Sequence, residues 1–183
     1  MASEGVPDFI PRVLLGIHKL NKDVVDPVFA TEGSACFDLF CNFDENTEIK
    51  TYSSINVKEN IRPYLTADKQ CVIRIYNGIR VMIPTGIIFD IPKNYSIRLH
   101  NRSGLAFKNG IKLVNQEAVI DSDYVEETMI LLENSCNQPY ELFNQTRVCQ
   151  AELVANVPIS FFDRKTRPTS KTRNGGFGST GVS

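Results

Sequence analysis

Two acidic residues, Asp121 and Asp123, flank a serine directly after an apolar run that ends at Ile120. A carboxylate placed there can take a proton from a water molecule, and two carboxylates together can bind Mg²⁺. An acidic turn between two strands has the same composition, and this segment alone slightly favours the turn. The stretch from Asn115 to Tyr124 is therefore a candidate site for acid–base chemistry.

A phosphate site is predicted at Arg102-Ser103-Gly104. These residues combine a guanidinium fork, a hydroxyl and a glycine at the expected start of a helical turn, where backbone N–H groups are free. A simple helix cap would use the same residue types.

The C-terminal stretch T-R-N-G-G-F-G-S-T-G, residues 172–181, can point several backbone N–H groups and two hydroxyls at an anion. It is not a Walker A loop, because no lysine precedes Ser179 and Thr180. A flexible tail is the plainer interpretation, but Phe177 among glycines suits a flat ligand such as a nucleobase.

Two further residues are ambiguous. Asp38 interrupts the apolar run G-S-A-C-F-D-L, where it could be a turn residue or a carboxylate facing a metal. Gln150 in R-V-C-Q would ordinarily be an unremarkable strand residue.

Composition limits the function classes. The chain has 183 residues, 42% of them hydrophobic, which fits one globular domain. A net charge of −1, from 20 basic and 21 acidic residues, argues against duplex-DNA binding and membrane-surface binding. We expect no stable nucleic-acid binding and no membrane association.

The expected location is the cytoplasm, or the host-cell cytoplasm if the protein is viral. The first residues lack the features of a signal peptide, and no apolar window reaches the ~20 residues that span a bilayer. Five cysteines without a C-x-x-C pair, beside only His18 and His100, favour reduced thiols and argue against a zinc site.

The elements that must position these residues are mostly strands, so the fold is predicted to be all-β, a sandwich, jelly roll or barrel. Strands are expected near 13–18, 72–76, 79–83, 95–99, 128–133 and 148–154, with one helical turn at 102–110. Asn77-Gly78 predicts a hairpin between the second and third of these strands. Residues 45–69 are polar and weakly periodic, which predicts an excursion from the sheet, and residues 163–183 form a tail.

Taken in order, these motifs closely resemble the five motifs of the trimeric dUTP diphosphatases (dUTPases). The motifs are G-S-A-x-x-D-L, R-S-G-L-A, N-x-x-x-x-I-D-S-D-Y, R-x-x-Q and R-x-G-G-F-G-S-T-G. The resemblance covers about residues 29–181, and its third and fifth motifs are the most specific.

The resemblance implies a jelly-roll β subunit, residues 1–162, with an insertion at about 45–69 and a flexible C-terminal arm, residues 163–183. It implies a homotrimer whose arm completes a neighbouring active site. The implied reaction hydrolyses dUTP to dUMP and pyrophosphate with Mg²⁺, which limits uracil incorporation into DNA and supplies dUMP for dTMP synthesis. The insertion could contact a protein partner.

The resemblance also implies residue roles. Asp121 would be the base that activates water, and Asp38 would reach Mg²⁺ through water. Asn115 and the backbone at Val119 and Ile120 would read the uracil edge, while Tyr124 would exclude a 2′-hydroxyl. Phosphate contacts would come from Arg102, Ser103, Gly104, Gln150, Arg173, Gly178, Ser179 and Thr180, and Phe177 would stack on uracil.

Departures from the family pattern concern turn glycines. Cys36-Phe37 replaces Gly-Tyr, and Val114, Ala118 and Glu126 stand where the family has glycine. Because non-glycine residues resist positive φ, the shape of the uracil hairpin is the feature that these changes affect.

Two alternatives remain. A dCTP deaminase shares the fold and trimer, but it has a catalytic glutamate where Leu131 aligns, with Glu133 two residues on. A regulatory protein on the same fold would bind partners through the insertion.

Overall fold

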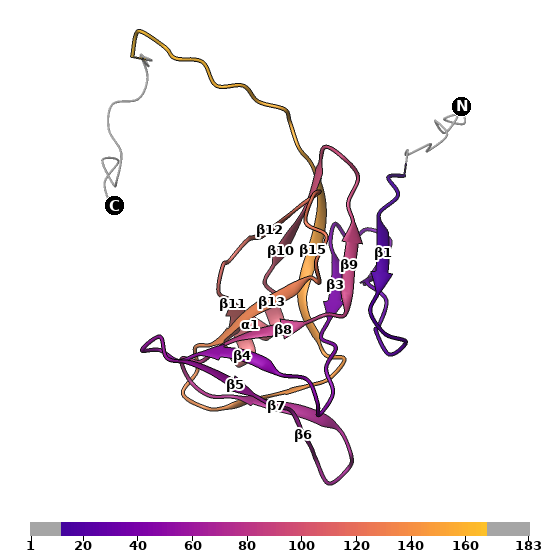
Figure 1. Ribbon diagram of the computed structural model, residues 1–183, viewed down its shortest axis with the longest axis vertical. Coiled ribbons are helices and arrows are strands. Elements are labelled where there is room, and N and C mark those ends of the chain that lie inside the picture. Colours follow the sequence, from indigo (N-terminus) through magenta and orange to yellow (C-terminus); the bar gives the residue numbers. More distant parts are fainter. Residues whose placement is uncertain (1–11, 168–183) are drawn as a thin grey trace, which may run out of the picture.

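The computed structural model describes residues 12–167, and it confirms the all-β prediction with a single short helix. Its strands form antiparallel sheets arranged around one core, as Figure 1 shows. The central sheet has five strands, in the order β12 (Ala118–Asp121), β10 (Tyr95–His100), β15 (Arg147–Ala155), β3 (Phe37–Phe40) and β2 (Val28–Phe29).

A second five-stranded sheet faces the same core. Its order is β11 (Ile111–Leu113), β13 (Met129–Asn134), β8 (Arg80–Pro84), β4 (Ile49–Tyr52) and β5 (Lys58–Ile61).

Two smaller sheets complete the body. One has the order β14 (Tyr140–Phe143), β7 (Cys71–Ile75) and β6 (Tyr64–Leu65). The other pairs β1 (Gly16–Lys19) with β9 (Ile87–Asp90), so the first strand begins three residues later than expected.

Alternation along the strands builds the core. On β10, Ile97 and Leu99 are buried, and on β13, Ile130 and Leu132 are buried. Because side chains alternate between the two faces of a strand, the intervening residues of β10 lie on the opposite face of the central sheet. That outer face therefore carries the polar residues.

The predicted helical turn is confirmed as α1 (Ser103–Asn109). Gly110 ends it in the left-handed region at φ 64°, where its N–H donates to Ala106 O, and an added Cβ would collide with the Cys136 sulfur. The buried side chain of Leu105 anchors the helix to the body.

The hairpin predicted around Asn77-Gly78 is wrong. A turn does form there, with Ile79 N–H donating to Tyr76 O at 3.1 Å. Its flanking strands do not pair: β7 pairs with β14 and β6, whereas β8 pairs with β13 and β4. Only Gly78 has positive φ, so the turn is not the type I′ that closes a hairpin, and it carries the chain from one sheet to another.

The prediction that residues 45–69 leave the sheet is also wrong, because this segment forms strands. This segment contains β4, β5 and β6, and β4 pairs with β8 inside the second sheet. Ile49 and Thr51 of β4 are buried, so alternate residues of this polar segment face the core. Its weak periodicity reflects strands of four residues or fewer.

After β15 the chain leaves the body as an extended segment, residues 156–167, drawn in gold in Figure 1. Among residues 12–167, no helix is long and apolar enough to cross a membrane.

Candidate functional site

The central sheet aligns residues from three of the sequence motifs. Gln150 on β15 lies opposite Asp38 on β3 and opposite His100 on β10. Directly opposed residues in an antiparallel sheet point to the same side, so these three side chains share the outer face. Arg102 follows two residues after His100, at the start of α1.

Asp38 is a buried charge held by two arginines. Its side chain is 3% exposed, with Oδ1 accepting from Arg102 Nε at 3.2 Å and Oδ2 accepting from Arg147 Nη1 at 3.1 Å. A buried carboxylate is stable only when it is paired in this way. Asp38 therefore fixes the positions of both guanidinium groups.

The two arginines keep hydrogen-bond donors for a ligand. Arg102 also donates from Nη1 to the Arg147 carbonyl at 3.1 Å, which leaves its Nη2 group unused among the described residues. Two guanidiniums against one carboxylate give the cluster a net charge of +1, which suits a phosphate. Arg147 is a residue that sequence reasoning missed, although it opens the R-x-x-Q motif.

Ser103 and Gly104 begin α1 beside this cluster and are exposed. The first helical hydrogen bond runs from Ala106 N–H to Arg102 O at 2.9 Å, so the N–H groups before Ala106 have no helical acceptor. A Cβ added at Gly104 would meet nothing within 4 Å. This chain itself therefore does not require glycine there.

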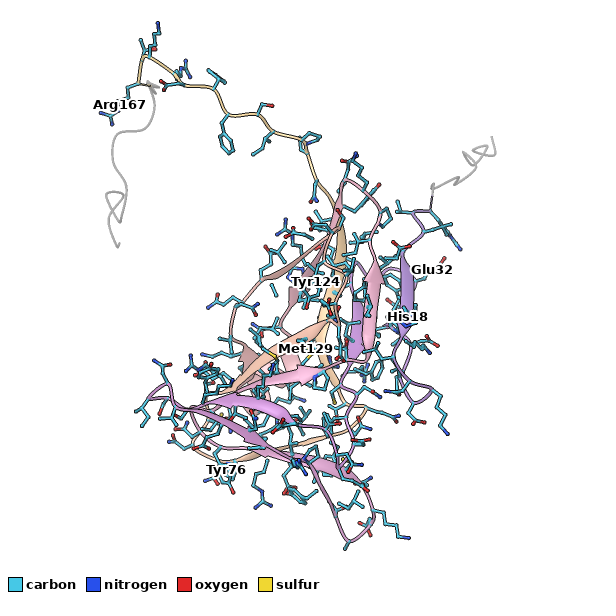
Figure 2. All side chains as sticks on the ribbon, in the orientation of Figure 1. His18, Glu32, Tyr76, Tyr124, Met129 and Arg167 are labelled. Carbon is cyan, nitrogen blue, oxygen red and sulfur yellow. The ribbon has the colours of Figure 1, made fainter. Side chains whose placement is uncertain are left out.

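The third motif forms a separate cavity of about 330 Å³. Five residues assigned to nucleoside binding and catalysis lie within the described part of the chain, and all of them line it, namely Asn115, Val119, Ile120, Asp121 and Tyr124. The remaining lining is mostly apolar and was not foreseen from motifs; it comes from Met82, Leu99, Ala118, Thr128, Met129 and Leu131. Figure 2 labels Tyr124 and Met129 in this part of the molecule.

Asp121 is the last residue of β12 and is exposed. Within residues 12–167 its carboxylate has no ion pair or side-chain hydrogen bond, so it can accept a proton from a bound water. Tyr124 is fixed next to it, because its N–H donates to Asp121 O at 3.1 Å and its hydroxyl donates to Glu127 O at 3.0 Å.

The backbone of the loop before β12 does not require glycine at positions 114 and 118, where the family has it. Val114 and Ala118 have ordinary negative φ, and Ala118 is buried in register with Leu99. The residue with positive φ is Gln116, at 47°. β11 and β12 belong to different sheets, so this loop is a crossing between sheets rather than a paired hairpin.

Asp121 and the arginine cluster lie toward opposite ends of β10, while the cavity lining runs along the strand as far as Leu99. Asp121 is in register with Ser96, whereas Arg102 lies beyond His100, four residues further along. At ~3.3 Å per residue, Ser96 and His100 are about 13 Å apart. Within one chain, Asp121 and the arginine cluster are therefore well apart.

The predicted contact of Asp38 with Mg²⁺ through water stays a prediction. Both Asp38 oxygens also accept from guanidinium groups, so the carboxylate lies in a cluster of net positive charge that suits an anion.

The predicted arm residues Arg173, Phe177, Gly178, Ser179 and Thr180 lie outside the described residues.

The deaminase alternative finds no support in the structure. Leu131 lines the cavity where a glutamate would be required, and Glu133 pairs with Lys112 across the sheet, at 3.9 Å between the charged atoms.

Comparison with known proteins agrees with this geometry. The family model described as dUTPase matches residues 64–181. A deoxyuridine 5′-triphosphate nucleotidohydrolase of Nautilia profundicola is 32% identical over 167 residues, covering 91% of this chain and 98% of that protein.

Solved structures show the same fold. The dUTPase of Staphylococcus bacteriophage 80alpha with dUPNHPP superposes with a TM-score of 0.70 at 17% identity, covering 92% of this chain and 99% of that one. A point mutant of the dUTPase from phage phi11 of S. aureus, described with a structural Mg(II) ion, gives a TM-score of 0.63 at 13% identity, covering 84% and 98%. With its ordered motifs, its cavity and the family match over more than half its length, this chain belongs to the dUTPase family.

Proposed function

We propose that this protein hydrolyses dUTP to dUMP and pyrophosphate by attack of water on the α-phosphorus. The observation that carries the proposal is the cavity that Asn115, Asp121 and Tyr124 line together. A pocket of this size with a few convergent polar groups in an apolar lining is typical of small-molecule sites. Membership of the family supplies the substrate class.

The nucleoside is held in this cavity. The Asn115 amide and the backbone at Val119 and Ile120 offer donors and acceptors to the edge of uracil. The Tyr124 ring, held by its bond to the Glu127 carbonyl, packs against the sugar and leaves no room for a 2′-hydroxyl.

The triphosphate is held by the arginine cluster. Arg102 and Arg147 are already aimed by Asp38, so little side-chain ordering is needed when the anion binds. Ser103 and Gly104 add a hydroxyl and backbone N–H groups, and Gln150 adds an amide from the adjacent strand.

Asp121 takes the proton of the attacking water. Phosphoryl transfer depends on positioning and on stabilising charge, so the base needs only to hold the water in line with the leaving pyrophosphate. Mg²⁺ is an expected requirement of the reaction, since it would neutralise part of the triphosphate charge, and Asp38 would reach it through water.

We also propose a homotrimer in which neighbouring chains share each site. Because Asp121 and the arginine cluster of one chain lie toward opposite ends of β10, a neighbouring chain can bring its own Asp121 to this arginine cluster. The extended segment after β15 supports this arrangement. Its apolar side chains Val157, Ile159, Phe161 and Phe162 are 73–94% exposed, as expected for a segment that packs on another chain. Figure 2 shows this segment leading away from the body towards Arg167.

The arm, residues 163–183, would then close over a neighbouring site, with Phe177 on the uracil and Arg173, Gly178, Ser179 and Thr180 on the phosphates. Truncation after Lys171 is expected to leave a trimer of normal stability with little activity. Full activity of the truncated protein would refute this role.

The decisive experiment measures pyrophosphate release from dUTP, UTP, dCTP and dTTP, each with Mg²⁺ and with a chelator. We expect rapid release from dUTP alone, and loss of that release with the chelator. Failure to hydrolyse dUTP, or equal rates with all four nucleotides, would overturn the proposal.

A further inference from the structure

A second group of reactive side chains lies on the outer face of the central sheet, next to the arginine cluster. The group consists of Cys36, His100 and Glu152, and one ligand atom from each lies within 4.8 Å of the other two. His100 ends β10, Glu152 is in the middle of β15, and Cys36 directly precedes β3. Three neighbouring strands therefore place the group, rather than one flexible loop.

The His100 ring is the central feature of this group. Its Nε2 atom is shielded from solvent and has no hydrogen-bond partner among the described residues, although the side chain as a whole is 32% exposed. The nearest carboxylate oxygen, Glu152 Oε2, lies 3.3 Å away. A shielded ring nitrogen without a partner is costly, so the arrangement calls for a group that would satisfy it.

The donor set points to the kind of group. A neutral imidazole nitrogen, a thiol sulfur and a carboxylate oxygen are all Lewis bases, and together they present lone pairs to one small volume. Tetrahedral Zn²⁺, with bonds of about 2.0–2.3 Å, places its ligand atoms about 3.3–3.6 Å apart. The separation of 3.3 Å between Nε2 and Oε2 matches that spacing.

The other ring nitrogen of His100 is also placed as in known metal sites. Nδ1 faces Glu117 Oε1 at 3.9 Å, so a small movement of this exposed carboxylate would let it accept the Nδ1 proton. Metal-bound histidines usually make such a bond, because it fixes the tautomer that leaves Nε2 free for the metal.

We propose that Cys36, His100 and Glu152 bind one Zn²⁺ ion per chain, with the fourth position open to water. A thiolate and an imidazole favour zinc over Mg²⁺ and Ca²⁺, which prefer ligand sets made only of oxygen. The ion would tie β3, β10 and β15 together beside Asp38, and its binding does not depend on the proposed hydrolysis. Cysteine spacing along the sequence argued against zinc, but the three ligands are far apart in the chain and meet only in the folded sheet.

The test is a calorimetric titration of the metal-free full-length protein with Zn²⁺ alone at neutral pH. We expect one ion per chain, and at least tenfold weaker binding in Cys36→Ser, His100→Gln and Glu152→Gln. Cys71→Ser and His18→Gln are matched controls, because Cys71 lies on β7 and His18 on β1, and they should bind like the wild type. Absence of zinc binding, or unchanged binding in Cys36→Ser and His100→Gln, would overturn the proposal.

Two measurements on the wild-type chain keep the test decisive if a variant folds poorly. Co²⁺ should give the near-ultraviolet absorption of a thiolate–cobalt bond, and Zn²⁺ should protect Cys36 from alkylation while leaving Cys71 reactive. Cobalt absorption without a thiolate band, or equal alkylation of Cys36 with and without Zn²⁺, would refute the assignment.

Discussion

The Asp38 carboxylate on β3 accepts a hydrogen bond from Nε of Arg102, which stands 64 residues later at the start of α1, at 3.2 Å. With the bond from Arg147 at 3.1 Å, it makes Asp38 the buried anchor of the cationic side of the site. Asp38 thus fixes the two arginines that we propose bind the phosphates.

Asp38→Asn should lower the free energy of unfolding by about 1–3 kcal/mol, because the two guanidiniums lose a charged acceptor. This change in the free energy of unfolding is smaller than for a fully buried ion pair, because the arginine side chains are 26% and 48% exposed and remain partly hydrated. Denaturant unfolding measures it, with the exposed Asp68→Asn as the control. A stability equal to that of the control would contradict the anchoring role. The KM for dUTP should also rise.

Asp121→Asn should reduce kcat by at least about a hundredfold, the usual range for a lost general base, with little change in nucleotide affinity. The fold should be unaffected, since the side chain is exposed. Steady-state kinetics and nucleotide binding measure the two effects. Asp123→Asn, two residues on, is the matched control. Normal turnover in Asp121→Asn would show that another group is the base.

Gly104→Ala separates folding from ligand binding. No atom of this chain lies within 4 Å of the added Cβ, and alanine favours helix by up to about 1 kcal/mol over glycine, so stability should stay equal or rise. The KM for dUTP should rise severalfold if phosphates approach this backbone. An unchanged KM would remove Gly104 from the phosphate site.

The Tyr124 ring, and not its hydroxyl, should decide selection against ribonucleotides. Tyr124→Ala is expected to raise activity on UTP relative to dUTP, because the space beside the sugar opens. Tyr124→Phe should retain selectivity, since it keeps the ring and loses only the bond to the Glu127 carbonyl. The ratio of kcat/KM for the two nucleotides measures selectivity. A loss of selectivity in the phenylalanine variant would assign it to the hydroxyl instead.

Mixed trimers test whether neighbouring chains share a site. Arg102→Ala and Asp121→Asn chains should each be inactive alone. If Arg102 and Asp121 of one site come from different chains, equal mixing and reassembly should restore about a quarter of the sites. Sites built within a single chain would show no recovery. The Asp121→Asn protein alone, taken through the same mixing and reassembly steps, is the control and should stay inactive.

The sequence by itself determined that the fold is β, and it supplied the candidate residues for the chemistry. Short apolar runs predicted β10, β13 and β15, and the helical turn predicted at residues 102–110 is α1 followed by Gly110. These features are local, because the alternation of a strand and the φ of a helix cap depend on nearby residues.

The tertiary structure decided which segments meet. Asn77-Gly78 predicted pairing of its two flanking strands, yet β7 and β8 enter different sheets, because the choice of a strand's partner depends on core packing and not on the turn alone. The same long-range register brings Arg147 to Asp38, and it brings Cys36 and Glu152 to His100. Each of these contacts joins distant positions through the sheet, so spacing along the chain carries no signal for it.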